Sequence, residues 1–599
     1  MESIKNKREK MEQVAKRRFF YVQSFESYGG VSGFFDYGPH MCALQNNFLT
    51  TWRRHFVLEE GMHEIDSAII TPFEVLKSSG HVDKFTDLMC TDTVTGEIYR
   101  ADHLVKEWLE RASEKAEAGA KQKMADTASM IDSFSEEDLQ GIINTYGIKS
   151  EQGNDLGKVV PFNLMFGTVV GPGGKTQSFL RPETAQGQFL NFKRLLEVNG
   201  DKMPFASAMV GKAFRNEISP RTGLFRVREF LMAEVEHFVH PEEKEHPKFA
   251  TCRETSIPLL FRKKGASDDS PQELQSMKMG EAVSTGVVNN ETLGYFIVRV
   301  FTFLVKIGIP ADQIRIRQHL PTEMAHYATD CWDAEISTSF GWIECVGIAD
   351  RACYDLSVHS KKTGDKLVAR RPLPHPVTEE RLAPVINKKE IGAKFRGKAQ
   401  SLILRLETMA EEEIQAKMSN NQIEIEEDGV SFLVKVEKRK ETKHVEEYVP
   451  NVIEPSFGIG RILYALLWHA FSQRETDEQR TVFSFLPGMA PVKCAILPLQ
   501  EDKRFTPLLQ EIKASLVSRG VSCTLDESKA SIGRRYSRAD EIGVPFCITV
   551  DFETLSDEQV TVRERDSLAQ KRVPISALPE FISSLVLEES VWTPGPVPV

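Results

Sequence analysis

The sequence predicts a mixed α and β fold (α+β, ending in an α/β part) with at least two domains. Two apolar segments, 208–210 and 230–236, flank a polar turn that contains Ser219-Pro220, and this pattern predicts a long antiparallel hairpin. From about residue 490 short strand-like segments alternate with helical ones, which is typical of a small α/β domain. The length of 599 residues also exceeds what one hydrophobic core usually supports.

The predicted hairpin carries charged side chains among its apolar residues, namely Arg215, Glu217, Arg226 and Glu234. Burying charges of mixed sign is costly without partners, so this set predicts a zwitterionic or polyphosphate ligand. The alternative is a solvated surface hairpin whose charges form exposed ion pairs. That alternative would place the charges on one face of the hairpin, and it does not explain the apolar residues around them.

Composition and charge limit the class of protein. Hydrophobic residues make up 41% of the chain and charged residues 27%, as in ordinary globular proteins. Glu2, Glu9 and Glu12 interrupt the basic N-terminus, which argues against a secretory signal or a mitochondrial presequence and predicts a cytoplasmic protein; a longer organellar form stays open. The net charge of −11 argues against nonspecific nucleic-acid binding but leaves room for a local basic patch. The nine cysteines lack Cys-x-x-Cys spacing, so reduced thiols and no structural zinc are expected.

Three segments have distinctive sequence patterns and follow one another in a fixed order. They are FDYGP at 35–39, FRNE at 214–217 within the hairpin, and EPSFGIGR at 454–461 before an amphipathic segment. These segments resemble motifs 1, 2 and 3 of the class II aminoacyl-tRNA synthetases, and the wording is similar to that of the dimeric, eukaryotic and archaeal-like glycyl-tRNA synthetases. The resemblance runs from about residue 34 to about residue 551. It implies an antiparallel β-sheet core flanked by helices and a C-terminal α/β anticodon-binding domain.

The resemblance also implies a function: ATP-dependent ligation of glycine to tRNA(Gly) through a glycyl-adenylate, with diadenosine tetraphosphate synthesis as a side activity. Mg²⁺ is expected with ATP, and the protein is expected to be a homodimer. A motif 1 helix from about His40 to His55 would expose the apolar residues Leu44, Phe48 and Trp52, which a monomer would leave in water.

Three residues are expected to handle the phosphates of ATP. Arg215 would bridge the α-phosphate and the attacking carboxylate, because a guanidinium fork suits both oxyanions. Arg226 would hold the γ-phosphate, and Glu344 resembles the carboxylate that holds Mg²⁺.

The adenine is expected to lie between Phe230 and Arg461, with Glu217 accepting a hydrogen bond from its amino group. The expected catalytic residues are Arg215, Glu217 and Arg461. The full ATP-binding set that the resemblance implies is Arg215, Asn216, Glu217, Arg226, Val227, Phe230, Glu344, Cys345 and Arg461.

A site selective for glycine must exclude larger amino acids such as alanine. A hydrophobic pocket alone distinguishes one methyl group by only about 1 to 3 kcal/mol. The residues that match the glycine pocket of the family are Glu183, Glu234, Glu454, Pro455 and Ser456, with Arg317 and Glu335 as further candidates. Converging carboxylates would repel one another in the empty site, and the glycine ammonium would relieve that repulsion.

The chain is expected to divide into a helical extension at 1–30, a catalytic domain at 31–488 and an anticodon-binding domain at 489–599. Arg534 and Arg535 are expected to contact the anticodon, whose unpaired bases and phosphates need stacking partners and cations. Insertions into the catalytic domain are expected at about 104–150, 262–290 and 360–445. The insertion at 104–150 is equally consistent with a solvated helical hairpin and with a contact to the acceptor stem of tRNA. The insertion at 262–290 is expected to be a mobile loop.

Two alternatives compete with this interpretation. A synthetase-like regulator or accessory polymerase subunit without aminoacylation activity would share the fold, since fold does not fix function. A sister synthetase for threonine, proline or serine would share the motifs; threonine enzymes use zinc, whose ligand pattern is missing here. Retention of the ATP-binding set favours an enzyme.

Overall fold

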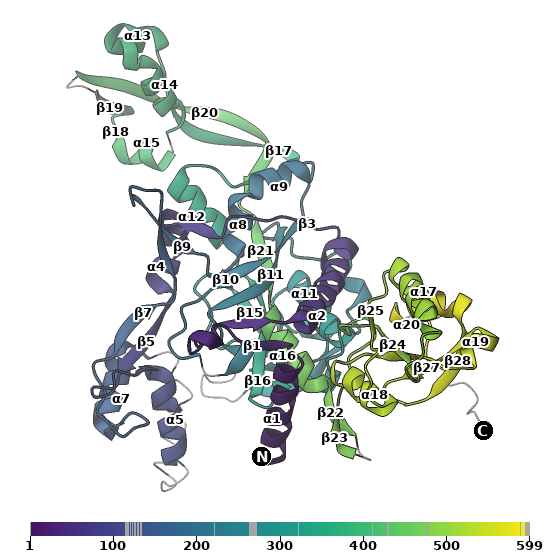
Figure 1. Cartoon of the computed structure of the whole chain (residues 1–599). Helices are drawn as coiled ribbons and strands as arrows, with labels where there is room; N and C mark the ends of the chain where they lie inside the picture. Colours follow the sequence, from purple (N-terminus) through teal and green to yellow (C-terminus); the bar gives the residue numbers. More distant parts are fainter. Residues whose placement is uncertain are drawn as a thin grey trace. The chain divides into compact units, whose positions relative to one another are not determined.

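The computed structural model describes most of the chain. The described residues are 2–113, 134–220, 222–262, 272–321, 323–409, 411–427, 430–474, 477–587 and 589–593, with isolated positions between 114 and 133. They form two compact units: Met1–Leu367 together with Pro450–Val599, and Val368–Val449 (Figure 1).

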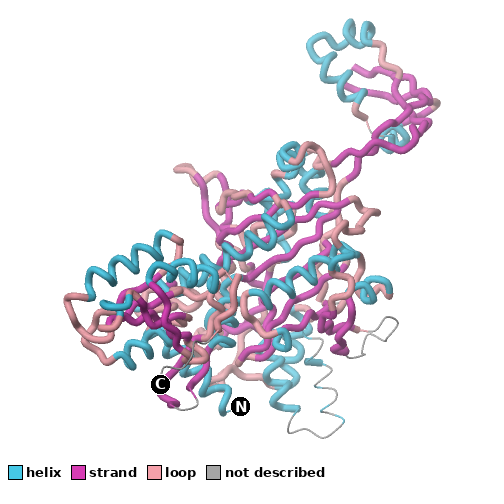
Figure 2. The backbone as a smooth tube through the Cα atoms, turned by 90° about the vertical axis from the view of Figure 1, so that its right-hand side faces the viewer, coloured by secondary structure: helices cyan, strands magenta, loops and turns pink. Residues whose placement is uncertain are grey.

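A nine-stranded β-sheet forms the centre of the larger unit (Figure 2). Its strands are β3 His63–Glu64, β10 Phe205–Phe214, β11 Glu229–Val239, β12 Ser256–Phe261, β13 Glu273–Lys278, β14 Ile314–Gln318, β15 Asp330–Thr338, β16 Gly341–Asp350 and β21 Asn451–Gly458. Their order is β13-β12-β14-β15-β16-β21-β11-β10-β3, and neighbours run antiparallel except in the pairs β12–β14 and β10–β3. The predicted antiparallel core is confirmed, and so is the hairpin, which is β10–β11.

Strand alternation separates the two faces of this sheet. Ala233 and Val235 of β11 belong to the main hydrophobic core, so Glu234 and Glu236 point to the opposite face. The long helices whose buried side chains join the main core are α1 Glu2–Arg17, α2 Pro39–Trp52, α11 Glu291–Lys306 and α16 Ile459–Ala470. On the other face, α8 (Ala185–Leu190) contacts β10 and β11, and α12 (Tyr354–Thr363) contacts α8.

The apolar stripe of the motif 1 helix lies inside the protomer. Leu44, Phe48 and Trp52 are fully buried in the main core. The Phe48 ring lies 5.3 Å from Phe303, and the Trp52 ring lies 5.9 Å from Phe457. The expectation that a monomer would leave this stripe in water is therefore wrong, because α11 and β21 already cover it.

The first insertion has its own small core, which extends from Cys90 to Val159. Its elements are β5 Thr86–Thr91, β6 Ile98–Arg100, α5 Ala101–Ser113, α7 Glu136–Tyr146 and β7 Val160–Asn163. Ser135 caps α7, with its hydroxyl accepting a hydrogen bond from the Asp138 amide at 3.2 Å. Part of the helical hairpin expected in this insertion lies outside the described residues, since most positions between 114 and 133 are not described.

The second insertion is not a loop throughout. Positions 263–271 lie outside the described residues. Beyond them, β13 pairs with β12 at the edge of the main sheet, and α10 (Met279–Ser284) buries Met279 and Ala282. The prediction of a loop is wrong here, because an edge strand keeps a polar, exposed face and composition alone cannot distinguish it from a loop.

The smaller unit, Val368–Val449, falls where the third insertion was expected at about 360–445. Two long strands, β17 (Ala369–Pro384) and β20 (Val430–Tyr448), pair antiparallel. The remaining elements are α13 Lys388–Phe395, α14 Ala399–Glu407, α15 Glu411–Lys417, β18 Met418–Ser419 and β19 Gln422–Glu427. The unit has a hydrophobic core of its own.

The C-terminal part is an α/β domain with a mixed five-stranded sheet, in the order β25-β24-β26-β27-β28. Its elements are β24 Cys494–Pro498, α17 Phe505–Ser518, β25 Cys523–Leu525, α18 Ile532–Glu541, β26 Phe546–Val550, α19 Thr554–Asp557, β27 Gln559–Glu564, β28 Gln570–Pro574 and α20 Leu578–Val586. The predicted alternation of strands and helices is confirmed.

The remaining α-helices and β-strands of the described chain are short. They are β1 Tyr21–Gln23, β2 Phe35–Tyr37, β4 Ile70–Pro72, α3 Phe73–Ser78, α4 His81–Lys84, β8 Gly167–Val170, β9 Thr176–Leu180, α9 Phe192–Val198, β22 Phe471–Arg474 and β23 Asp477–Phe483. No helix among the described residues is long and apolar enough to cross a membrane. All nine cysteines carry free thiols.

Candidate active site

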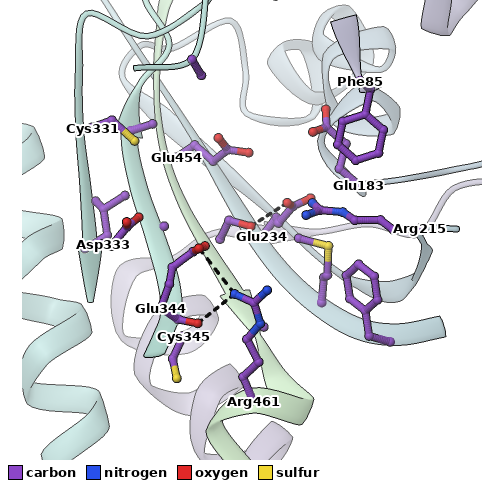
Figure 3. Close-up of a pocket in the computed structure, with 18 of the residues that line it drawn as sticks. Phe85, Glu183, Arg215, Glu234, Cys331, Asp333, Glu344, Cys345, Glu454 and Arg461 are labelled. Carbon is purple, nitrogen blue, oxygen red and sulfur yellow. Dashed lines mark hydrogen bonds and ion pairs between the residues drawn. The ribbon is translucent and has the colours of Figure 1, made fainter. Parts of the chain in front are cut away.

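A cavity of about 400 Å³ lies against β11, β16 and β21 (Figure 3). The predicted site residues that line it are Glu183, Arg215, Glu217, Arg226, Val227, Phe230, Glu234, Glu344, Cys345, Glu454, Ser456 and Arg461. Among the described residues, Asn216 and Pro455 are not in the lining. The backbone amide of Asn216 donates to the Leu164 carbonyl at 2.6 Å. Pro455 alternates with Glu454 and Ser456, so it faces the main core together with Ile453.

One end of the cavity, here called the arginine end, contains Arg215 between two aromatic rings. Its guanidinium carbon lies 5.3 Å from the Phe85 ring and 5.4 Å from the Phe230 ring. Its Nε donates to the Pro182 carbonyl at 3.3 Å, and Figure 3 shows the guanidinium directed into the cavity. Aromatic faces stabilise a cation while leaving most of its donors for a ligand.

Two further arginines complete the arginine end. Arg226 pairs with Glu217 at 3.2 Å. Arg461 donates to the carbonyls of Phe225 and Glu344 at 3.1 and 2.9 Å, and it lies 3.5 Å from the Glu344 carboxylate. The Glu344 side chain is 53% exposed; the desolvation of its carboxyl acts to raise the pKa of Glu344, but the charges of Arg461 and Arg215 outweigh it and lower that pKa.

A β-bulge positions Glu344. Glu335 on β15 pairs with Glu344 and Ala334 pairs with Val346, which leaves Cys345 as an extra residue on β16. A bulge re-aims the side chains around it. It accounts for two consecutive residues, Glu344 and Cys345, both reaching the cavity.

The opposite end, here called the acidic end, consists of Glu183, Glu234, Glu454 and Ser456. Glu234 accepts hydrogen bonds at 2.7 Å from the Thr184 amide and from the Ser456 hydroxyl. Burial, reinforced by the charge of Glu183, raises the pKa of Glu234.

The other two carboxyls of the acidic end differ in their neighbours. Burial acts to raise the pKa of Glu183, but His81, 3.3 Å away, and Arg351 outweigh it and lower that pKa. Burial raises the pKa of Glu454 to about 8; Arg351 opposes this shift, and the neighbouring Glu234 reinforces it.

Arg351 organises the acidic end, although no motif in the sequence identified it. It is 1% exposed and donates to Glu454 at 2.9 Å and to both oxygens of Asp355 at 2.8 and 3.0 Å. Its guanidinium also stacks 3.8 Å from the Tyr327 ring. The sequence signal was an arginine directly after a strand with an aspartate four residues later, which predicts an i,i+4 ion pair.

A second group missed from the sequence lies beside Glu344. His319 and Asp333 both line the cavity and contact each other at 2.8 Å. Burial acts to lower the pKa of His319, but its hydrogen bond to Asp333 outweighs this and raises the pKa to about 11. The further candidates Arg317 and Glu335 pair with each other at 3.1 Å behind this group and are not in the lining.

The two arginines expected at the anticodon have different environments. Arg534 is exposed at the start of α18. Arg535 is 3% exposed and donates to four carbonyls of its own domain, those of Pro498, Leu499, Asp526 and Ala530. The prediction is therefore wrong for Arg535, because its guanidinium already satisfies buried carbonyls.

Known proteins are similar to this chain over nearly its whole length. A glycine–tRNA ligase of Caenorhabditis elegans is 48% identical over 98% of this chain and 80% of its own length. Mitochondrial glycine–tRNA ligase 1 of Saccharomyces cerevisiae is 46% identical over 98% of this chain and 92% of its own. The chain belongs to the glycine–tRNA ligase family. The Methanocaldococcus jannaschii relative is 42% identical over 97% of the chain and 99% of its own length.

Two comparisons concern the fold. Residues 493–585 match a family described as an anticodon binding domain, within the part expected at 489–599. Giardia lamblia prolyl-tRNA synthetase, solved with prolyl-adenylate, aligns over 98% of this chain and 80% of its own with a TM-score of 0.50. The identity of 12% makes this a likeness of fold alone. The predicted class II fold is confirmed.

Proposed function

We propose that the chain ligates glycine to tRNA(Gly) at the expense of ATP, through a glycyl-adenylate. One observation carries the proposal: a single cavity joins an arginine end suited to a nucleotide and an acidic end suited to an ammonium. The curated relatives that are 46–48% identical over nearly the whole chain are named glycine–tRNA ligases.

In the first step, a carboxylate oxygen of glycine attacks the α-phosphorus of ATP and pyrophosphate leaves. Positioning and charge neutralisation dominate such a displacement. Arg215 neutralises both the α-phosphate and the attacking carboxylate. Arg226 takes the γ-phosphate, Glu217 accepts from the adenine amino group, and Arg461 stacks on the base opposite Phe230.

Mg²⁺ is proposed to accompany ATP at Glu344. Asp333 lies close enough for its charge to interact with that of Glu344, and oxygen ligands suit Mg²⁺. When bound, the ion neutralises phosphate charge. Glu344 is the residue that would hold the ion, with Asp333 adding negative charge nearby.

The acidic end binds the glycine ammonium. Glu183, Glu234 and Glu454 supply negative charge, while Thr184 and Ser456 fix the orientation of Glu234. The carboxylates repel one another until the ammonium arrives, which favours a ligand with a compact cation. In the second step, the terminal tRNA hydroxyl attacks the activated carbonyl and AMP leaves.

Glycine-dependent exchange of pyrophosphate into ATP tests the proposal without tRNA. The exchange is expected with glycine and at least about tenfold weaker with alanine, since one methyl group is worth about 1 to 3 kcal/mol even in a simple pocket. A well-folded protein without exchange would favour the synthetase-like regulator, and exchange driven by threonine, proline or serine would favour a sister enzyme.

The C-terminal domain is proposed to read the anticodon through the exposed Arg534. Arg534→Glu is expected to lower the charging of tRNA about tenfold, because a cation becomes an anion beside RNA phosphate, and to leave pyrophosphate exchange unchanged. Both rates are measured on one preparation. Equal loss of exchange and charging would show that this face supports the catalytic core instead.

The homodimer remains a prediction, now without support from the buried motif 1 stripe. Sedimentation at micromolar concentration is expected to give a species of twice the 67.6 kDa chain mass. A single species at the chain mass would contradict it.

Two finer parts of the proposal have separate tests. Diadenosine tetraphosphate would form when a second ATP attacks the adenylate, and chromatography of a glycine–ATP reaction without tRNA detects it. The cytoplasm is the proposed compartment, although one yeast relative carries the word mitochondrial in its name. A fluorescent fusion found only in an organelle would contradict this location.

A further inference from the structure

Glu236 is a buried carboxyl that the proposed reaction leaves without a role. It follows Glu234 by two residues on β11, so both side chains leave the same face of the sheet. Glu236 is 0% exposed, and neither of its oxygens has a hydrogen-bond partner among the described residues. An ionised carboxylate in such surroundings is strongly disfavoured.

Glu236 lies directly behind the glycine-binding carboxyls. The register that pairs Glu234 with Ser456 and His237 with Ile453 puts Glu454 opposite Glu236 on the neighbouring strand. One oxygen from each of Glu234, Glu236 and Glu454 lies within 4.8 Å of the other two. Three negative charges at this spacing in a buried site would repel one another strongly.

The surrounding charges do not neutralise Glu236. The titratable groups whose charges interact with Glu236 or Glu454 include Glu183, Glu234, Tyr327, Cys331, Arg351 and Asp355. Arg351 is the cation of this set, and its hydrogen bonds go to Asp355 and Glu454. Burial, reinforced by the charge of Glu454, raises the pKa of Glu236 well above its usual range, although Arg351 acts in the opposite direction.

We propose that Glu236 is a positioning residue for glycine: it stays a neutral carboxylic acid and directs its single proton at Glu454. A neutral carboxyl group has one hydrogen-bond donor, its O–H. The neighbouring carboxylates are the groups that can accept a hydrogen bond from it. A hydrogen bond of this kind favours the ionised form of Glu454, which is the form that attracts an ammonium. The inference rests on the proposed function, since it assigns Glu454 to glycine binding.

Two substitutions test the role of the proton. Glu236→Gln keeps a donor of the same shape, so the KM for glycine is expected within about threefold of wild type. Glu236→Met keeps the volume and removes the donor, so that KM is expected to rise about 10- to 100-fold, the usual effect of losing a hydrogen bond to a charged group. The KM for ATP is expected to stay unchanged in both. A Gln variant as damaged as the Met variant, or a Met variant with wild-type KM, would overturn the proposal.

Thermal melting provides a readout independent of activity. In the unfolded wild-type protein, Glu236 loses its proton above about pH 4.5, whereas in the folded protein it keeps that proton. Because the folded state binds one more proton, the free energy of unfolding falls as the pH rises above about 4.5. Glu236→Gln has no such proton. The variant is therefore expected to melt above wild type at pH 8, with a gap that narrows towards pH 5.

A gap that does not change with pH would contradict a neutral Glu236. A stoichiometric divalent cation that is bound by wild type and lost in Glu236→Gln would also contradict the proposal. The carboxyls of Glu234, Glu236 and Glu454 would then hold a metal ion in place of a proton. Since melting requires no exchange activity, failure of the proposed function and failure of this inference are distinguishable.

Discussion

Arg215→Ala is expected to lower glycine-dependent pyrophosphate exchange by about 100- to 1,000-fold, the usual effect of removing one donor aimed at developing charge. Arg215 lies between the Phe85 and Phe230 rings, and only its Nε is committed to a backbone carbonyl, that of Pro182. The guanidinium of Arg215 is therefore available mainly to a ligand, and it contributes little to packing of the core. The free energy of unfolding is expected to change by about 1 kcal/mol or less.

Two variants control this experiment. Arg215→Lys keeps the charge but loses the planar fork, so partial activity is expected. Arg54→Ala removes an exposed arginine outside the cavity lining and should leave exchange unchanged. Exchange near the wild-type rate in Arg215→Ala would remove Arg215 from the reaction.

Arg351→Met is expected to lower the free energy of unfolding by about 3 to 5 kcal/mol, because it leaves buried carboxylates without their cation. Arg351 holds Asp355 and Glu454 by hydrogen bonds and lies 3.8 Å from Glu183. Denaturant unfolding measures the loss, and glycine-dependent exchange should fail in parallel. The pKa of Glu454 is raised to about 8 by burial, so this carboxyl gains its proton below that pH and the loss should shrink as the pH falls from about 8.

The matched control is Arg111→Met, which breaks an exposed pair with Glu107 at 3.7 Å. Its effect is expected within about 0.5 kcal/mol, as for other surface pairs. A wild-type unfolding curve for Arg351→Met would mean that the surrounding carboxyls are already neutral, and the electrostatic description of the acidic end would be wrong.

Local patterns in the sequence were sufficient for the parts of the molecule that depend on neighbouring residues. The hairpin β10–β11 follows from two apolar segments around a polar turn, and the C-terminal domain follows from alternating strand and helix patterns. The residues of motifs 2 and 3 meet in one cavity because β11 and β21 are adjacent strands of the main sheet.

Predictions failed where distant segments decide the outcome. The apolar stripe around Phe48 has the same pattern whether its cover is a second protomer or α11 of its own chain. Arg535 looks like an accessible cation until the fold brings the Pro498 and Leu499 carbonyls to it. Arg351 and Glu236 belong to no local motif, and their importance follows from the buried carboxyls that the sheet gathers around them.

Charging of tRNA is the most direct test of the central claim. Purified protein is incubated with ATP, labelled glycine and total tRNA, and acid-precipitable label is counted; parallel reactions contain alanine, proline, threonine or serine. The account predicts that glycine alone becomes esterified and only to tRNA(Gly), and that Arg215→Ala slows the reaction by at least about 100-fold. Esterification of a different amino acid, or none by a folded wild-type protein that binds ATP, would contradict it.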